Sequence, residues 1–96
     1  MTQNHPKYKL LQLCTKTEIY RTDTSTLLAY DEDKNKYLFR ALNSNFFVQI
    51  DNNESIEILE MDRAEELWHE LPVKYISNII AAFPKVLGDV EKNFYI

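Results

Sequence analysis

The 96-residue chain contains very little glycine, cysteine or histidine, and each shortage excludes a kind of site. Gly88 is its only glycine, so it lacks the glycine-rich loops that bring a backbone close to phosphate groups. Cys14 is its only cysteine, which excludes an internal disulfide and is expected to be a small buried side chain. With only His5 and His69 besides, a structural zinc site of four Cys or His ligands cannot form. The sequence therefore predicts no metal and no cofactor.

Long hydrophobic runs are also missing. Apolar stretches such as residues 46–48 and 79–83 are far shorter than the roughly 20 residues of a membrane-spanning helix. The first residues lack the charged, apolar and small-residue regions of a signal peptide, so we expect a cytoplasmic protein that does not enter a membrane. A hydrophobic content of 45% is sufficient for one domain, residues 1–96, with a core of its own.

Strand-like segments alternate with polar turns over the first sixty residues. Asp, Asn and Ser fill the intervening turns, where Asn and Asp tolerate a left-handed backbone without glycine. Short connections favour antiparallel pairing of consecutive strands, so the sequence predicts a meander of four to six strands. The segments rich in β-branched, aromatic and aliphatic residues are Tyr8–Cys14, Glu18–Thr22, Thr26–Tyr30, Tyr37–Leu42, Phe46–Ile50 and Ser55–Leu59.

Helical periodicity begins after the last of these segments. The spacing of apolar residues over 62–71 predicts a helix with one apolar face, and Asp62 with Glu65 has the pattern of a capping box. A second helix is expected from Val73 to Phe83, where Pro84 stops it, followed by a short strand or helix over 90–96. The predicted fold class is α+β, with both helices packed on one face of an antiparallel sheet.

Aromatic residues dominate the other face of the predicted sheet. Tyr37, Phe39 and Phe47 point away from Leu38 and Leu42, which we expect the helices to cover. Two outcomes remain open for these rings. Left open, they form a patch for a partner or for a second copy of the chain, which would favour a homodimer. Alternatively, the twisted sheet curls and buries them.

Acidic residues are concentrated between Glu54 and Glu70. Seven of them stand against the single basic residue Arg63, a balance of −6 within a chain whose net charge is −4. Such a segment attracts basic surfaces and repels phosphate backbones, so direct nucleic-acid binding is not expected. We predict a non-catalytic protein-binding domain, such as an inhibitor or immunity-type protein with a basic protein partner. Its expected contact residues are Glu57, Glu65, Glu66, Glu70, Tyr37, Phe39 and Phe47.

Catalytic constellations are sparse in the sequence. Glu66 and His69 have the Glu-x-x-His spacing of di-iron bundles, but such sites need further carboxylates from facing helices, so we expect both side chains to point to solvent. No serine lies in a glycine-flanked turn beside a base, and we predict no catalytic residues. The alternative is a small enzyme or ligand-binding domain with a polar cleft between sheet and helices, near Tyr37 and Arg40. A deep polar pocket would favour that alternative.

Overall fold

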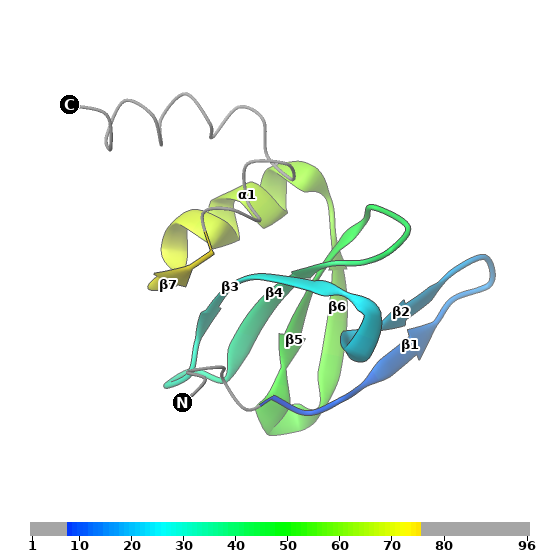
Figure 1. The fold of residues 1–96 in the computed structure, drawn as a ribbon, viewed down its shortest axis with the longest axis horizontal. Coiled ribbons are helices and arrows are strands. Elements are labelled where there is room, and N and C mark those ends of the chain that lie inside the picture. The colour runs from blue at the N-terminus through cyan, green and yellow to red at the C-terminus, as the bar shows by residue number, and fades with distance from the viewer. Residues whose placement is uncertain (1–7, 76–96) are drawn as a thin grey trace, which may run out of the picture.

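The computed structural model describes residues 8–75, which form a five-stranded antiparallel sheet, a two-stranded hairpin and one α-helix (Figure 1). The strand order in the sheet is β6-β5-β4-β3-β7, and β1 pairs with β2 alone. The α+β class is confirmed. The elements are β1 (Gln12–Cys14), β2 (Ile19–Arg21), η1 (Thr22–Thr24), β3 (Thr26–Asp31), β4 (Lys36–Arg40), β5 (Phe46–Ile50), η2 (Asp51–Asn53), β6 (Ser55–Leu59), α1 (Met61–Glu70) and β7 (Val73–Lys74).

Three turns between the strands need a left-handed backbone, and none of them contains glycine. Asn35, Ser44 and Glu54 have φ angles of 53°, 73° and 52° in the β3–β4, β4–β5 and β5–β6 connections. Asn35 is the residue type that the sequence predicts for such a turn, because its side chain tolerates this conformation. Glu54 is not, because its Cβ lies close to the following carbonyl oxygen in this region and its longer side chain lacks the local hydrogen bonds that make Asn tolerated there. Glu54 therefore carries a local conformational cost.

Helix α1 lies on one face of the sheet and encloses the first hydrophobic core. Ala64, Leu67 and Trp68 of the helix and the following Leu71 are buried, as the predicted apolar stripe requires. They pack with residues of the central strands, including Leu38 and Val48. The capping-box prediction is wrong, because Glu60 is the N-cap residue and no side chain caps it. Leu42 is 81% exposed in the turn after β4, so it is not covered as predicted.

The segment after α1 returns to the sheet instead of continuing as a helix. Leu71 has an extended backbone (φ −76°, ψ 134°), and Pro72 cannot donate a helical hydrogen bond. Val73 and Lys74 then pair with Tyr30 and Ala29 of β3. The prediction that a second helix starts at Val73 is wrong, and the described residues contain a single α-helix. The remainder of that predicted helix and the predicted element over 90–96 lie outside the described residues.

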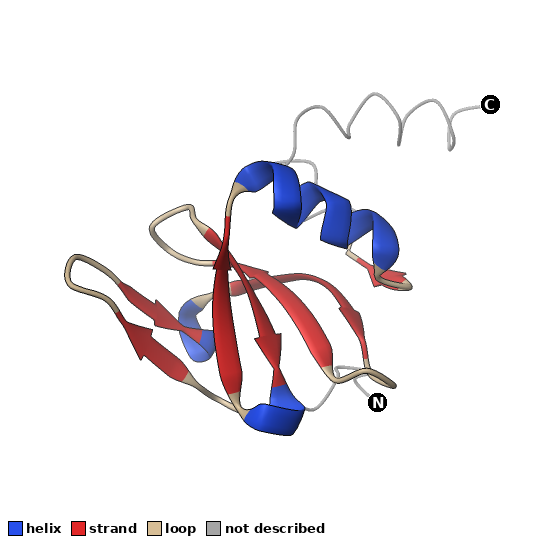
Figure 2. Ribbon diagram, turned by 180° about the vertical axis from the view of Figure 1, so that it is seen from behind, coloured by secondary structure: helices blue, strands red, loops and turns tan. Residues whose placement is uncertain are grey.

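The aromatic face of the sheet is buried in a second core. Tyr37, Phe39 and Phe47 are 1%, 0% and 0% exposed. The Phe39 and Phe47 rings stack with centroids 5.1 Å apart. Tyr8 packs edge-to-face with Phe39, with centroids 5.2 Å apart, and Tyr20 does the same with Phe47 at 6.0 Å. The sequence left two outcomes open, an exposed aromatic patch or burial of the rings. In the structure the rings are buried. The chain segment leading into β1 and the β1–β2 hairpin cover them on the side opposite α1 (Figure 1, Figure 2).

A buried polar network fastens this cover to the sheet. Gln49, fully buried on the aromatic face, accepts a hydrogen bond from the Thr22 hydroxyl at 2.5 Å. Its amide nitrogen donates to the Lys9 carbonyl and to Asp51 Oδ1, both at 2.6 Å. The other oxygen of Asp51 accepts from the Lys9 backbone N–H at 3.0 Å. The network gives hydrogen-bond partners to the buried side chains of Thr22, Gln49 and Asp51. It also holds the first described residues against the aromatic core.

Candidate functional site

The outer surface of α1 is the acidic region predicted from the sequence. Its inner residues are buried, so the helix period places Asp62, Glu66, His69 and Glu70 in solvent, while Glu65 is half-buried. The prediction that Glu66 and His69 point to solvent is confirmed. Asp62, Glu65, Glu66 and His69 surround a shallow depression of about 350 Å³. The helix thus presents three carboxylates around one imidazole on an open surface.

Arg63 partly compensates the acidic residues on one side of α1. Its Nη1 lies 3.5 Å from Glu66 Oε1 and 3.4 Å from Glu70 Oε2. All three side chains are more than half exposed, so water screens these pairs and each contributes little to folding stability. Glu65 lies on the other side of the helix, and no basic residue of the described chain forms an ion pair with it. The uncompensated charge is therefore centred on Asp62 and Glu65.

Glu57 lies apart from the helical carboxylates, on the edge strand β6. It is opposite Val48, which packs beneath α1, so Glu57 is on the helix side of the sheet. There it lines a hollow of about 60 Å³ between sheet and helix, together with Lys36 and Arg63. A hollow of this size holds about two water molecules. Of the predicted acidic contact residues, Glu57, Glu66 and Glu70 thus lie near Arg63, while Glu65 is next to Glu66 on the far side of the α1 depression.

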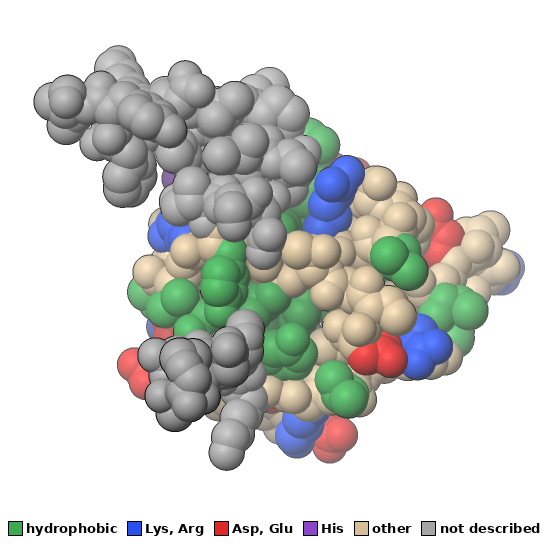
Figure 3. All heavy atoms as spheres, in the orientation of Figure 1, with side chains coloured by type: hydrophobic (Ala, Val, Ile, Leu, Met, Phe, Trp, Pro, Cys, Tyr) green, Lys and Arg blue, Asp and Glu red, His purple; other side chains and the backbone are tan. Residues whose placement is uncertain are grey.

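Tyr37, Phe39 and Phe47, the aromatic members of the predicted contact set, are not on this surface. They lie in the second core beneath the cover described above, so they are not available to a partner in this structure. The face shown in Figure 3 has hydrophobic side chains gathered near its middle. Acidic and basic side chains are interspersed around its rim. On this face the acidic side chains are mixed with basic ones, and no patch of a single sign is seen there among the described residues.

The polar cleft expected near Tyr37 and Arg40 does not form at those residues. Successive residues of a strand alternate between faces, so Tyr37 lies in the aromatic core while Arg40 lies on the face that carries α1. The two side chains cannot line one site. Arg40 Nε and Trp68 Nε1 are buried, and neither has a hydrogen-bond partner. The sequence places Trp68 in the apolar stripe of α1, so no local pattern indicated that its indole N–H would lack a partner.

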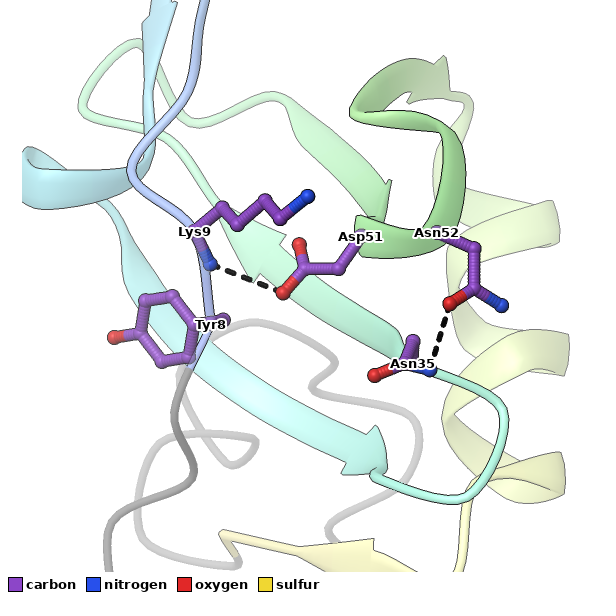
Figure 4. Close-up of a pocket in the computed structure, with 5 residues that line it drawn as sticks. All are labelled: Tyr8, Lys9, Asn35, Asp51 and Asn52. Atoms are coloured by element: carbon purple, nitrogen blue, oxygen red, sulfur yellow. Dashed lines mark hydrogen bonds between the residues drawn. The ribbon is translucent and has the colours of Figure 1, made fainter.

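A polar pocket lies at the end of the sheet where the β3–β4 turn and η2 meet the start of the described chain (Figure 4). Tyr8, Lys9, Asn35, Asp51 and Asn52 line a depression of about 470 Å³. Its polar groups already bond to one another: Asp51 accepts from Lys9 N–H, and Asn35 Nδ2 donates to Asn52 Oδ1 at 2.9 Å. These contacts join the start of the described chain to two turns of the sheet. The pocket is thus a structural junction whose polar side chains are occupied by protein partners.

Cys14 differs from its sequence prediction. It is exposed on β1, where its sulfur accepts a hydrogen bond from Gln12 Nε2 at 3.2 Å. The hairpin has two strands and covers the aromatic core with only part of its surface, so its apolar run is not fully buried.

No group of three or more His, Cys, Asp or Glu side chains within residues 8–75 is arranged to hold a metal ion. In the same range, no helix has the length and apolar character needed to cross a membrane.

Comparison of the chain with protein-family models, with curated proteins and with solved structures found no match. Its function is accordingly inferred from its own surface.

Proposed function

We propose that this domain is a non-catalytic protein-binding module that presents the outer face of α1 to a basic protein partner. The supporting observation is the convergence of Asp62, Glu65 and Glu66 around one shallow depression. Because α1 is packed through the buried Leu67 and Trp68, the backbone that carries these carboxylates is in place before a partner arrives. Pre-positioned charge of one sign favours rapid association with a surface of opposite sign.

The shape of this surface suits a protein better than a small molecule. The depression beside α1 is shallow and wide, whereas small-molecule sites are usually concave and mostly apolar. Basic proteins that bind nucleic acid expose arginine and lysine side chains to phosphates, and carboxylates can occupy the same positions. An inhibitor or immunity-type role against such a protein agrees with this chemistry. The partner would place its basic side chains between Asp62 and Glu66.

The test compares two variants that remove the same charge from different places. Glu65→Gln/Glu66→Gln removes two negative charges from the α1 surface, and Glu32→Gln/Asp33→Asn removes two from the β3–β4 turn. Association rates are measured for a partner obtained by cross-linking in the source cells, at low and high salt. We expect the α1 variant to slow association and to reduce its salt dependence, because exposed charges are screened over about 8–10 Å. Equal effects of the two variants would contradict the proposal.

A further inference from the structure

Strand β6 forms one end of the central sheet, and its outer edge is unpaired within residues 8–75. Its residues Ser55–Leu59 pair with β5 on the inner side, and no strand of residues 8–75 pairs with the outer side. Alternate residues of an edge strand direct their N–H and C=O groups away from the sheet. Such a row of groups can accept a further strand from another chain.

This edge lacks most of the features that prevent strand addition. Its pairing with β5 runs without a bulge over five residues, and the strand contains no proline or lysine. Ile58 is 41% exposed, and Ile56 is half-buried. Both lie on the aromatic face, opposite Phe47 and Gln49 of β5. An incoming strand would therefore find apolar neighbours for two of its side chains on that face.

A hollow at the end of β6 extends the apolar surface. It has a volume of about 460 Å³ and opens between the β4–β5 turn and the start of α1. Ile58, Leu59 and Met61 contribute apolar side chains to its lining, and Met61 is half exposed. The hollow thus adds apolar surface at the end of β6, next to Ile58.

Glu57 gives this edge a negative charge on the face that carries α1. It lies between Ile56 and Ile58 on the opposite face, and Glu54 and Glu60 flank the strand, all three exposed. If two copies paired through all five residues of β6 in antiparallel fashion, Glu57 would lie directly opposite the Glu57 of the second copy. Like charges directly opposite each other destabilise a strand pair. A second copy is thus disfavoured, whereas a strand with a basic residue at this position is favoured.

We propose that the outer edge of β6 binds an extended segment of the basic partner, in which a lysine or arginine between two apolar residues lies opposite Glu57. This inference rests on the proposed function and specifies how the partner is held. Backbone hydrogen bonds to β6 provide the attachment, Glu57 selects the basic residue, and Ile56 and Ile58 contact the flanking apolar residues. The α1 surface then contacts other basic residues of the same partner.

The test uses the full chain and two capped peptides that differ in one charge, acetyl-Thr-Val-Lys-Val-Thr-amide and acetyl-Thr-Val-Glu-Val-Thr-amide. Backbone amide signals are followed by NMR during titration. We expect the lysine peptide to shift the signals of Ser55–Leu59 and to bind about two- to fivefold more tightly than the glutamate peptide. Glu57→Lys should reverse this preference. The matched control Glu32→Lys, in the exposed β3–β4 turn, should leave it unchanged.

Three outcomes would overturn the inference. Shifts confined to residues 62–70 would leave the α1 surface as the binding site, and the proposed function would stand without strand addition. Equal binding of both peptides at β6 would remove the role of Glu57. Concentration-dependent shifts of β6 without peptide, together with a dimer in sedimentation, would make a second copy the occupant. If the lysine peptide shifts β6 but the α1 variant associates with the partner as fast as the control variant, only the proposed role of the α1 surface is contradicted.

Discussion

The side-chain oxygen of Gln49 accepts a hydrogen bond from the Thr22 hydroxyl, and this contact joins the central sheet to the chain that covers its aromatic face. The orientation of the Gln49 amide is fixed, since both partners of its nitrogen are acceptors, the Lys9 carbonyl and Asp51. Gln49 is a polar residue on the aromatic face of the sheet. Its hydrogen bonds thus determine where the covering segment packs over the second core.

Replacement of Gln49 by leucine should lower the free energy of unfolding by about 2–3 kcal/mol. The change leaves buried acceptors on Asp51 and at the Lys9 carbonyl without their donor. Urea denaturation measures the loss, and amide exchange at Leu11 reports release of the covering segment. Gln12→Leu, on the exposed surface of β1, serves as the control and should change stability by less than about 0.5 kcal/mol. Similar values for both variants would contradict a role for the network.

Trp68 should be the residue of α1 whose loss costs most. It is 4% exposed within the first core, so Trp68→Ala should cost about 3–5 kcal/mol through lost burial and the cavity left behind. Trp68→Phe should cost distinctly less, because it keeps most of the apolar ring and removes an indole N–H that is buried without a partner. Urea melts compare the two with the exposed His69→Ala. A loss below 1 kcal/mol for Trp68→Ala would mean that the helix does not pack in this way.

Glu54→Gly should stabilise the protein by about 0.5–1 kcal/mol. Glycine adopts the left-handed backbone of this turn without a Cβ clash, although it also loses more conformational freedom on folding. The exposed contact between Glu54 and Lys9, 3.7 Å long, contributes little against this gain. Asn52→Gly, in the neighbouring η2 where no positive φ is needed, should destabilise instead. Thermal or urea melts would reveal the opposite signs, and equal signs would contradict the explanation.

Stability should fall as the pH rises above about 10. Burial, followed by the nearby Tyr75 or Asp51, raises the pKa of Tyr8, Tyr30 and Tyr37. A raised pKa in the folded state gives stability that is complete below the unfolded pKa and is lost as the pH rises through the folded pKa. Burial lowers the pKa of Lys74, which acts in the opposite direction, so three of the four shifted groups favour a fall in stability.

Urea melts between about pH 8 and pH 11 measure this dependence. Tyr30→Phe should flatten it, since it removes one of the shifted groups and keeps the ring in the core. A free energy of unfolding that stays constant or increases over this range would show that the hydroxyl groups are not desolvated.

Neutralising the acidic surface should leave the fold intact. Glu65→Gln/Glu66→Gln/Glu70→Gln breaks both ion pairs of Arg63, yet these pairs are exposed and worth only a few tenths of a kcal/mol each. The unfolding midpoint in urea should therefore change little, so any loss of partner binding reflects the surface itself. A large loss of stability would mean that the acidic residues serve the fold.

Local sequence patterns were sufficient for most of the secondary structure. The bounds of β5 and β6 agree with the prediction, and α1 differs from the predicted helix by one residue at each end. Strand alternation and helical periodicity are properties of consecutive residues, so they can be read without knowing the rest of the fold. The same periodicity placed Glu66 on the outside of the helix and Trp68 on the inside.

Only the tertiary structure decided which surfaces remain open. Alternation placed Tyr37, Phe39 and Phe47 on one face, but their burial depends on Tyr8 and Tyr20, which are distant in sequence and brought there by the Gln49 network. Val73 and Lys74 became a strand because β3 offered them an edge, which no local pattern records. The open edge of β6 has the same origin: a strand's position in the sheet depends on pairing between distant segments, whereas its existence depends on neighbouring residues.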